Sequence, residues 1–200
     1  HIMCGIVALI GSREAAPLIV DGLSKLEYRG YDSAGLATVK ALEGGKGNLT
    51  CKRAQGKLIN LASIIKQSSV EGHLGIGHTR WATHGKPEEH NAHPHRDSSG
   101  QIAVVQNGII ENHTFLRNQL KAQGVEFSSD TDTEVIPHLI AKELDNLKKE
   151  GFNENGTTLL RAVQKVLKLI EGAYALAVIW ANSPDSLIVA KRQAPLIIGL

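Results

Sequence analysis

The sequence predicts an α+β domain. Its 200 residues contain short apolar runs of strand length and longer segments in which apolar residues recur every three or four positions, and the two patterns follow one another in an irregular order. Turn signals typical of hairpins separate several neighbouring runs. No repeat, linker or change of composition divides the chain, so we expect a single domain.

In the first 78 residues the expected elements end at recognisable signals. The apolar run Ile6–Ile10 stops at Gly11, as a buried strand does. A helix is expected over 16–26, where apolar residues recur at helical spacing and Pro17 lies in the first turn. The same patterns then predict a strand hairpin over 36–39 and 49–53, a helix over 58–65 and a strand over 74–78.

The second half opens with a long polar segment. Residues 79–100 hold two prolines and show no period, which is typical of a functional loop. The next strand, 102–105, ends at Asn107-Gly108, a pair common in hairpin turns. Further patterns predict a loop over 128–133, helices around 116–124, 134–147 and 160–170, and strands over 174–181 and 187–190.

Composition excludes several classes of protein. The charged residues, 22 basic and 20 acidic, give a net charge of +2, and no basic stretch with interleaved aromatics suggests nucleic-acid binding. The longest apolar run, Ala173–Ala181, is too short for a bilayer, which needs about 20 residues. Two cysteines do not make a disulfide framework, so we expect a reduced, cytoplasmic setting without membrane attachment.

The residues at the two ends of the chain also suggest where the domain begins and ends. His1-Ile2 precede Met3, and we expect residues 1–3 to be a foreign leader plus an initiator Met, with the domain occupying 4–200. The chain stops inside an apolar run at Ile198-Gly199-Leu200, so we expect the domain to be truncated at its C-terminus.

Cys4 is the strongest candidate for a reactive residue. A free cysteine at the start of a strand is usually a small buried hydrophobe. If Met3 is removed, however, Cys4 carries a thiol and a free α-amine on one residue. Because the pKa of an α-amine is about 7.7–8.0, the amine can act as the general base for its own thiol.

Other segments agree with a nucleophilic Cys4. They occur in the order Cys4-Gly5-Ile6-Val7, Leu26-Glu27-Tyr28-Arg29-Gly30-Tyr31-Asp32-Ser33-Ala34-Gly35, Gly77-His78-Thr79-Arg80-Trp81-Ala82-Thr83-His84-Gly85, Asn107-Gly108-Ile109-Ile110-Glu111-Asn112 and Thr131-Asp132-Thr133-Glu134. This set resembles the glutaminase domains of the class II glutamine amidotransferases, which are N-terminal-nucleophile hydrolases. The second segment points to the glucosamine-6-phosphate synthase branch of that family.

The resemblance implies a fold, a reaction and partners. It implies a four-layer αββα sandwich of two antiparallel sheets, which hydrolyses L-glutamine to glutamate and ammonia through a γ-glutamyl thioester on Cys4. No cofactor is expected. The ammonia would pass to a C-terminal sugar isomerase domain, absent from this sequence, in a full-length enzyme that we expect to be a homo-oligomer.

The resemblance also implies site residues. The Asn107 amide and the Gly108 N–H would hold the oxyanion, although the pair could equally form a plain turn. Arg80 would bind the substrate α-carboxylate and Asp132 its α-ammonium, the simpler alternatives being a surface arginine and a helix cap. The loop residues Trp81, Thr83 and His84 would close over glutamine, and Arg29 would lie beside the nucleophile.

Two points stay open at this level. Many members of the family have His before the Asn-Gly pair, whereas this chain has Gln106, which leaves the hydrogen bonds around it undefined. The main rival is a metal-dependent hydrolase that uses histidines of the polar loop, although their spacing matches no metal motif. These histidines are His84, His90, His93 and His95. A glutaminase domain of another class II amidotransferase is the remaining alternative.

Overall fold

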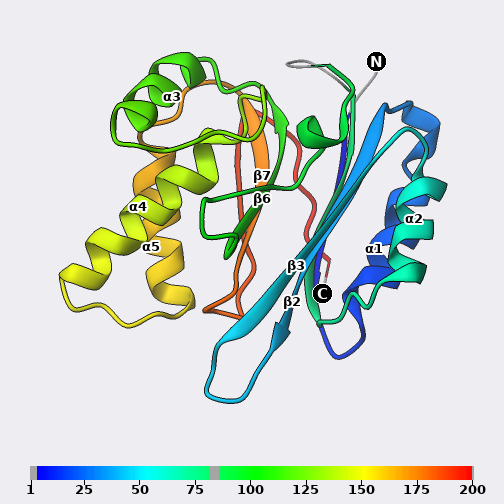
Figure 1. Cartoon of the computed structure of the whole chain (residues 1–200), viewed down its shortest axis with the longest axis horizontal. Helices are drawn as coiled ribbons and strands as arrows, with labels where there is room; N and C mark the ends of the chain where they lie inside the picture. Colours follow the sequence, from blue (N-terminus) through cyan, green and yellow to red (C-terminus); the bar gives the residue numbers. More distant parts are fainter. Residues whose placement is uncertain (1–3, 82–85, 200) are drawn as a thin grey trace.

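The computed structural model describes residues 4–81 and 86–199, except for the side chain of Arg29 (Figure 1). Two four-stranded antiparallel sheets pack face to face, and helices cover the outer face of each sheet. The α+β class and the four-layer arrangement expected from the sequence are therefore confirmed.

The first sheet has the strand order β1-β4-β2-β3. Its strands are β1 (Gly5–Ile10), β2 (Ser33–Ala41), β3 (Gly47–Gln55) and β4 (Leu74–Arg80). Strands β2 and β3 form the hairpin that the glycine-rich turn predicted, and β4 lies between β1 and β2. This topology places the start of β1 beside the end of β4, since Gly5 pairs with Thr79.

Two helices cover this sheet, α1 (Ala15–Ser24) and α2 (Leu58–Gln67), with a short 3-10 turn at Glu27–Arg29. Helix α1 lies close to β4 because the strand presents glycine there. A Cβ on Gly77 would lie 2.2 Å from Cγ2 of Ile19, a fully buried residue of α1. Glycine is therefore required by the contact between helix and strand.

The second sheet has the order β5-β6-β7-β8. Its strands are β5 (His95–Arg96), β6 (Ile102–Gly108), β7 (Tyr174–Trp180) and β8 (Ile188–Arg192), and its helices are α3 (His113–Ala122), α4 (Val135–Lys149) and α5 (Gly156–Leu167). A 3-10 turn, Glu89–Asn91, precedes β5. The three helices lie together on the face of this sheet that points away from the first sheet (Figure 1).

Successive side chains of a strand point to opposite faces of the sheet, and this alternation divides the core into layers. In β1, Val7 and Leu9 pack against the helices, whereas Ile6 and Ala8 face the other sheet. The inter-sheet layer also contains Ile76 of β4 and Val105 of β6. Two positions further along these strands, His78 and Asn107 continue the same inner faces, so the alternation directs both side chains into the space between the sheets.

The structure departs from the sequence expectation in two places. Strand β4 continues to Arg80, and the polar segment 79–100 contains the two-residue strand β5, which pairs with β6 and is too short to leave a periodic pattern. Asn107-Gly108 is not a hairpin turn, because both residues remain in the β6–β7 ladder. The chain leaves the sheet only after Gly108.

No helix within residues 4–81 and 86–199 is long and apolar enough to cross a membrane.

We predict that Gly77→Ala lowers the free energy of unfolding by about 1–3 kcal/mol, because the new methyl group overlaps Ile19. Gly11→Ala is the matched control, since a Cβ there meets nothing within 4 Å, and its effect should stay within about 0.5 kcal/mol. Urea unfolding of both variants measures the difference. Equal stability of the two variants would contradict the packing argument.

Candidate active site

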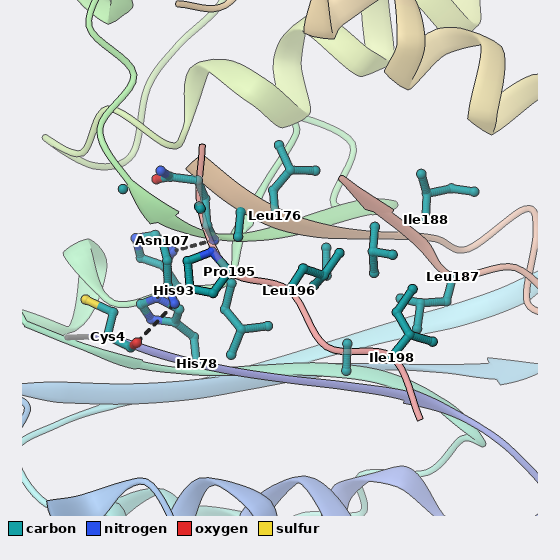
Figure 2. A pocket seen from close by; sticks show the side chains of 18 of the residues that line it. Cys4, His78, His93, Asn107, Leu176, Leu187, Ile188, Pro195, Leu196 and Ile198 are labelled. Carbon is teal, nitrogen blue, oxygen red and sulfur yellow. Dashed lines mark hydrogen bonds between the residues drawn. The ribbon is translucent and has the colours of Figure 1, made fainter. Parts of the chain in front are cut away.

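One end of the space between the sheets collects the polar residues that the sequence singled out. Cys4 directly precedes β1, Arg80 ends β4 and Asn107 lies near the end of β6. All three line a cavity of about 1710 Å³, together with Gly108 and Asp132. Figure 2 shows Cys4, His78, His93 and Asn107 grouped at one end of this cavity, and apolar side chains at the other.

The Cys4 thiol is held by the backbone of Trp81. The Trp81 N–H donates to Sγ over 3.1 Å, and Sγ lies 3.6 Å from the Trp81 carbonyl oxygen. Burial raises the pKa of the thiol, whereas the Trp81 hydrogen bond and the positive charge of Arg80 oppose that rise. Cys4 is therefore mainly a thiol near neutral pH and needs a base before it can attack.

Within the described residues, Cys4 Sγ makes hydrogen bonds to backbone groups, those of Trp81 and of Cys4 itself. No described histidine or carboxylate makes such a bond, so a side-chain base in hydrogen-bond contact is lacking in that part of the chain. The α-nitrogen of Cys4 itself is the natural alternative.

The Asn107 side chain connects the two sheets. Its Nδ2 donates to the carbonyl oxygen of Cys4 over 3.0 Å, and its Oδ1 lies 2.8 Å from Nε2 of His78. An amide nitrogen carries two hydrogens, and the Cys4 carbonyl takes one of them. Asn107 therefore has a second donor hydrogen beside Cys4.

Gly108 adopts a backbone conformation that favours glycine. Its φ is +109°, and a Cβ there would lie 2.1 Å from the carbonyl oxygen of Ala173. The N–H of Gln106, two residues earlier, points away from β7 and donates to Nδ1 of His93 over 3.3 Å. Because N–H directions alternate along a strand, the Gly108 N–H also points away from β7.

Arg80 is not a surface residue: it is 3% exposed. Its Nη1 lies 3.7 Å from Oδ1 of Asp32 and donates to the carbonyl oxygen of Lys86 over 3.3 Å. The ion pair with Asp32 compensates the burial of the guanidinium, which faces the cavity. A cation held in this way is suited to bind a carboxylate.

Asp132 is also buried, and the alternative reading of it as a helix cap is wrong. Helix α4 has no side-chain cap, and Oδ2 of Asp132 instead accepts from the N–H of Ile110 over 2.7 Å. This bond ties the loop before α4 to the segment after β6. It places a carboxylate on the cavity wall near Asn107 and Gly108.

The remaining predicted residues lie around the cavity mouth or outside the described part. Trp81 lines the cavity and is 43% exposed, and the edge of its ring lies over Gly30. Thr83 and His84 lie outside the described residues. Arg29 ends the 3-10 turn next to Gly30, but its side chain also lies outside them.

The histidines of the polar loop are engaged in other contacts. His90 pairs with Glu88 and Asp130 at the surface. The His93 ring stacks on His78 and meets the ring of His95 edge-on. Among the residues that the structure describes, no group of three or more His, Cys, Asp or Glu is placed to hold a metal ion. The geometry of these residues therefore lends no support to the metal-hydrolase alternative.

Gln106, the departure from the usual family pattern, is buried and is one of the residues that line the cavity. Its Oε1 accepts from the hydroxyl of Thr133, in the segment that precedes α4, over 2.6 Å. Its backbone N–H contacts His93. Gln106 therefore joins the residues around Asp132 to the histidine stack without contacting Cys4 in the described hydrogen bonds.

Sequence reasoning missed two partners of the predicted residues. Asp32 lies within the Tyr-Arg-Gly-Tyr-Asp segment and pairs with Arg80, and His78 lies two residues before Arg80 and contacts Asn107. The position of His78 in β4 was a usable signal, because residues two apart on a strand share a face. Asp32 could not be found by spacing, because its partner is on another strand.

Many apolar side chains line the far end of the cavity. Leu176, Leu187 and Ile188 line it, together with the irregular segment 193–199 (Figure 2). In that segment Ile197 is 94% exposed and Ile198 is 69% exposed. Polar side chains also line the cavity beside Leu187, from residues 155–157 and from Asp185 and Ser186.

Comparisons with known proteins match this arrangement. The sequence pattern of a family described as a glutamine amidotransferase domain matches residues 78–198. Proteins named glutamine--fructose-6-phosphate aminotransferase [isomerizing] are 59% identical over 197 residues in Thermosynechococcus vestitus and 55% in Synechocystis sp.. Each match covers 98% of this chain but 30% of the relative, so the chain spans about 30% of the length of these curated relatives.

A solved structure shares the fold as well. Glutamine phosphoribosylpyrophosphate (PRPP) amidotransferase from B. subtilis superposes with a TM-score of 0.70 and 31% identity, over 94% of this chain and 36% of that one.

We predict that the stability of this domain falls as the pH drops below about 6.5, the usual pKa of histidine in an unfolded chain. Burial lowers the pKa of His78 to about 4 and of His95 to about 3, and that of His93 well below its usual value. Nearby Arg53 and Arg80 add to the lowering, and Glu134 opposes it at His95. Between these values and about pH 6.5 the unfolded chain binds more protons than the folded one, so acid favours unfolding.

Urea unfolding at about pH 7 and about pH 5 tests this expectation, with a lower midpoint at the acidic pH. His93→Gln should reduce the pH dependence because one buried titrating ring is gone. His73→Gln is the control, since it removes an exposed ring beside Glu14 and not a buried one. Identical midpoints of the wild type at both pH values would show that the buried histidines do not carry the linkage.

Proposed function

Because this chain belongs to the glutamine amidotransferase family, we propose that it hydrolyses L-glutamine to glutamate and ammonia through a thioester on Cys4. The observation that carries the proposal is the convergence of a thiol, an amide donor, a buried guanidinium and a buried carboxylate on one cavity. These groups belong to Cys4, Asn107, Arg80 and Asp132.

The reaction begins with attack of Cys4 Sγ on the side-chain carbonyl carbon of glutamine. A C–S bond forms, the carbonyl electrons move onto oxygen, and the α-amine of a terminal Cys4 takes the thiol proton. When the C–N bond breaks, that proton goes to the leaving nitrogen, which departs as ammonia. Water then cleaves the thioester to give glutamate and the free thiol.

The oxyanion of each tetrahedral intermediate needs donors that are already in place. The second Nδ2 hydrogen of Asn107 and the N–H of Gly108 fill this role in our proposal. Support comes from the Asn107 bond to the Cys4 carbonyl and from the direction of the Gly108 N–H, away from β7. Both donors belong to a strand of the rigid second sheet.

Recognition of free glutamine requires one positive and one negative group, since the amino acid is a zwitterion. We assign the α-carboxylate to Arg80 and the α-ammonium to Asp132, both of which line the cavity. Trp81 and the following Thr83 and His84 would close over the bound substrate, and Arg29 would lie beside the nucleophile.

The complete protein would use the ammonia in synthesis. The curated relatives carry the name glutamine--fructose-6-phosphate aminotransferase [isomerizing] and are about three times as long as this chain. We therefore propose that ammonia passes to a C-terminal isomerase domain that forms glucosamine 6-phosphate, in a homo-oligomeric cytoplasmic enzyme. The 200-residue chain alone should release ammonia without making the sugar.

We predict that Cys4→Ala abolishes glutaminase activity in protein that starts at residue 4, whereas Cys51→Ala stays active, because Cys51 lies outside the site against Pro94. Incubation with the glutamine-like electrophile 6-diazo-5-oxo-L-norleucine should add one adduct, on Cys4. Ammonia release and peptide mass spectrometry measure both effects. Wild-type turnover by Cys4→Ala would reject the thioester mechanism.

The form that retains His1–Met3 should be nearly inactive although folded. Its Cys4 nitrogen is part of a peptide bond, whose lone pair is delocalised and cannot act as a base. Intact mass and ammonia release on the two forms compare them directly. Equal turnover would assign the base to a different group.

Steady-state kinetics should separate binding residues from the oxyanion donor. Arg80→Lys and Asp132→Asn should chiefly raise KM, since they contact parts of glutamine that do not react. Asn107→Ala should chiefly lower kcat, by about 10²–10³-fold. A normal kcat in Asn107→Ala would remove its oxyanion role.

A further inference from the structure

The orientation of the Asn107 amide is determined by its two neighbours. The Cys4 carbonyl oxygen can only accept a hydrogen bond, so the group 3.0 Å from it must be the NH₂ of Asn107. Oδ1 must then face His78, whose Nε2 lies 2.8 Å away. Because Oδ1 only accepts, Nε2 of His78 has to carry a hydrogen.

His78 has one ring hydrogen to give at neutral pH. Its ring is 1% exposed, and burial lowers its pKa to about 4, while the Asn107 amide and the Gln106 backbone oppose that shift and Arg80 adds to it. The neutral ring must therefore be the Nε2–H tautomer. Nδ1 makes no hydrogen bond within the described residues, as expected for a bare nitrogen.

The His78 ring is also fixed in place. His93 stacks on it with a centroid distance of 4.2 Å and an angle of 13° between the planes. His93 is itself held by the Gln106 N–H at Nδ1 and by edge contact with His95. The stack lies between the two sheets, so the tautomer and direction of His78 are set by the fold before substrate arrives.

We propose that His78 is a positioning residue, which donates from Nε2 to Asn107 Oδ1 and so keeps the Nδ2 hydrogens directed at the Cys4 carbonyl and at the developing oxyanion. This inference rests on the proposed function. Without the His78 donor, only the Cys4 carbonyl holds the amide in this orientation, and rotation of the amide by half a turn costs less. The amide would then present Oδ1, a repulsive group, to the Cys4 carbonyl and to the oxyanion.

The test uses protein that starts at Cys4. His78→Leu removes the donor and should lower kcat by about 10- to 100-fold with little change in KM, because only the alignment of an oxyanion donor is lost. His78→Gln keeps an N–H of similar reach and should restore most of kcat. His138→Leu is the control: it removes another buried histidine, which contacts neither Cys4 nor Asn107 in the described hydrogen bonds, and should leave kcat unchanged.

A double variant separates positioning from a general structural effect. In Asn107→Ala the amide is gone, so adding His78→Leu should lower kcat no further. The inference would be overturned if the two reductions in kcat multiply in the double variant, or if His78→Leu keeps a wild-type kcat. In either case the proposed function would still be supported by labelling of Cys4 and by turnover of the wild type. A wild-type protein without glutaminase activity would instead reject the function itself.

Nuclear magnetic resonance gives a readout that does not depend on activity. Long-range proton–nitrogen spectra of histidine-labelled protein at about pH 7 should show His78 protonated at Nε2 and bare at Nδ1. A His78 ring protonated at Nδ1 alone could not donate to Asn107 and would refute the inference.

Discussion

The hydrogen bond from the Asn107 amide to the Cys4 carbonyl joins the first strand of one sheet to a strand of the other, across 103 positions of sequence. The rest of the site depends on this link, because it sets how close the thiol of one sheet lies to the donors of the second. The first sheet positions Cys4 and Arg80, and the second sheet positions Asn107. The reactive geometry exists only when the apolar faces between the sheets are packed together.

This constraint explains why so many polar groups are buried at one end of an apolar layer. Leaving a buried polar group without a partner costs about 1–3 kcal/mol, so these polar side chains pair with a side chain or a backbone group. Arg80 forms an ion pair with Asp32, Asp132 accepts a hydrogen bond from the Ile110 N–H, and Asn107 is hydrogen-bonded to His78. The same contacts that make burial tolerable also hold the groups in the orientation that the proposed reaction needs.

Local patterns predicted the elements well, since apolar periodicity and turn residues act over short distances. The hairpin of β2 and β3 follows from its glycine-rich turn, and helix α4 from its regular apolar positions. Strand β5 could not be predicted, because its two residues become a strand only by pairing with Val104 and Ala103.

The site likewise has parts that local motifs predict and parts that depend on contacts between distant segments. The resemblance of short motifs identified Cys4, Arg80, Asn107 and Asp132, and the structure brings all four to one cavity. The neighbours that orient them were not predictable from spacing, since each such contact joins segments that are far apart in the sequence. His78 illustrates this limit: its residue type was visible, but its bond to Asn107 arises only from the packing of β4 against β6.

The chain contains two tryptophans, which lie in opposite surroundings. Trp81 is half exposed at the cavity mouth, with its backbone bound to the Cys4 thiol, whereas Trp180 is 4% exposed at the end of β7 in the core beneath the helices. Their intrinsic fluorescence therefore has two separable components. A change confined to the long-wavelength, quencher-accessible emission of Trp81 reports events at the thiol. A change in the shielded emission of Trp180 reports loss of the folded core. One spectrum therefore distinguishes a disturbed site from a disturbed domain.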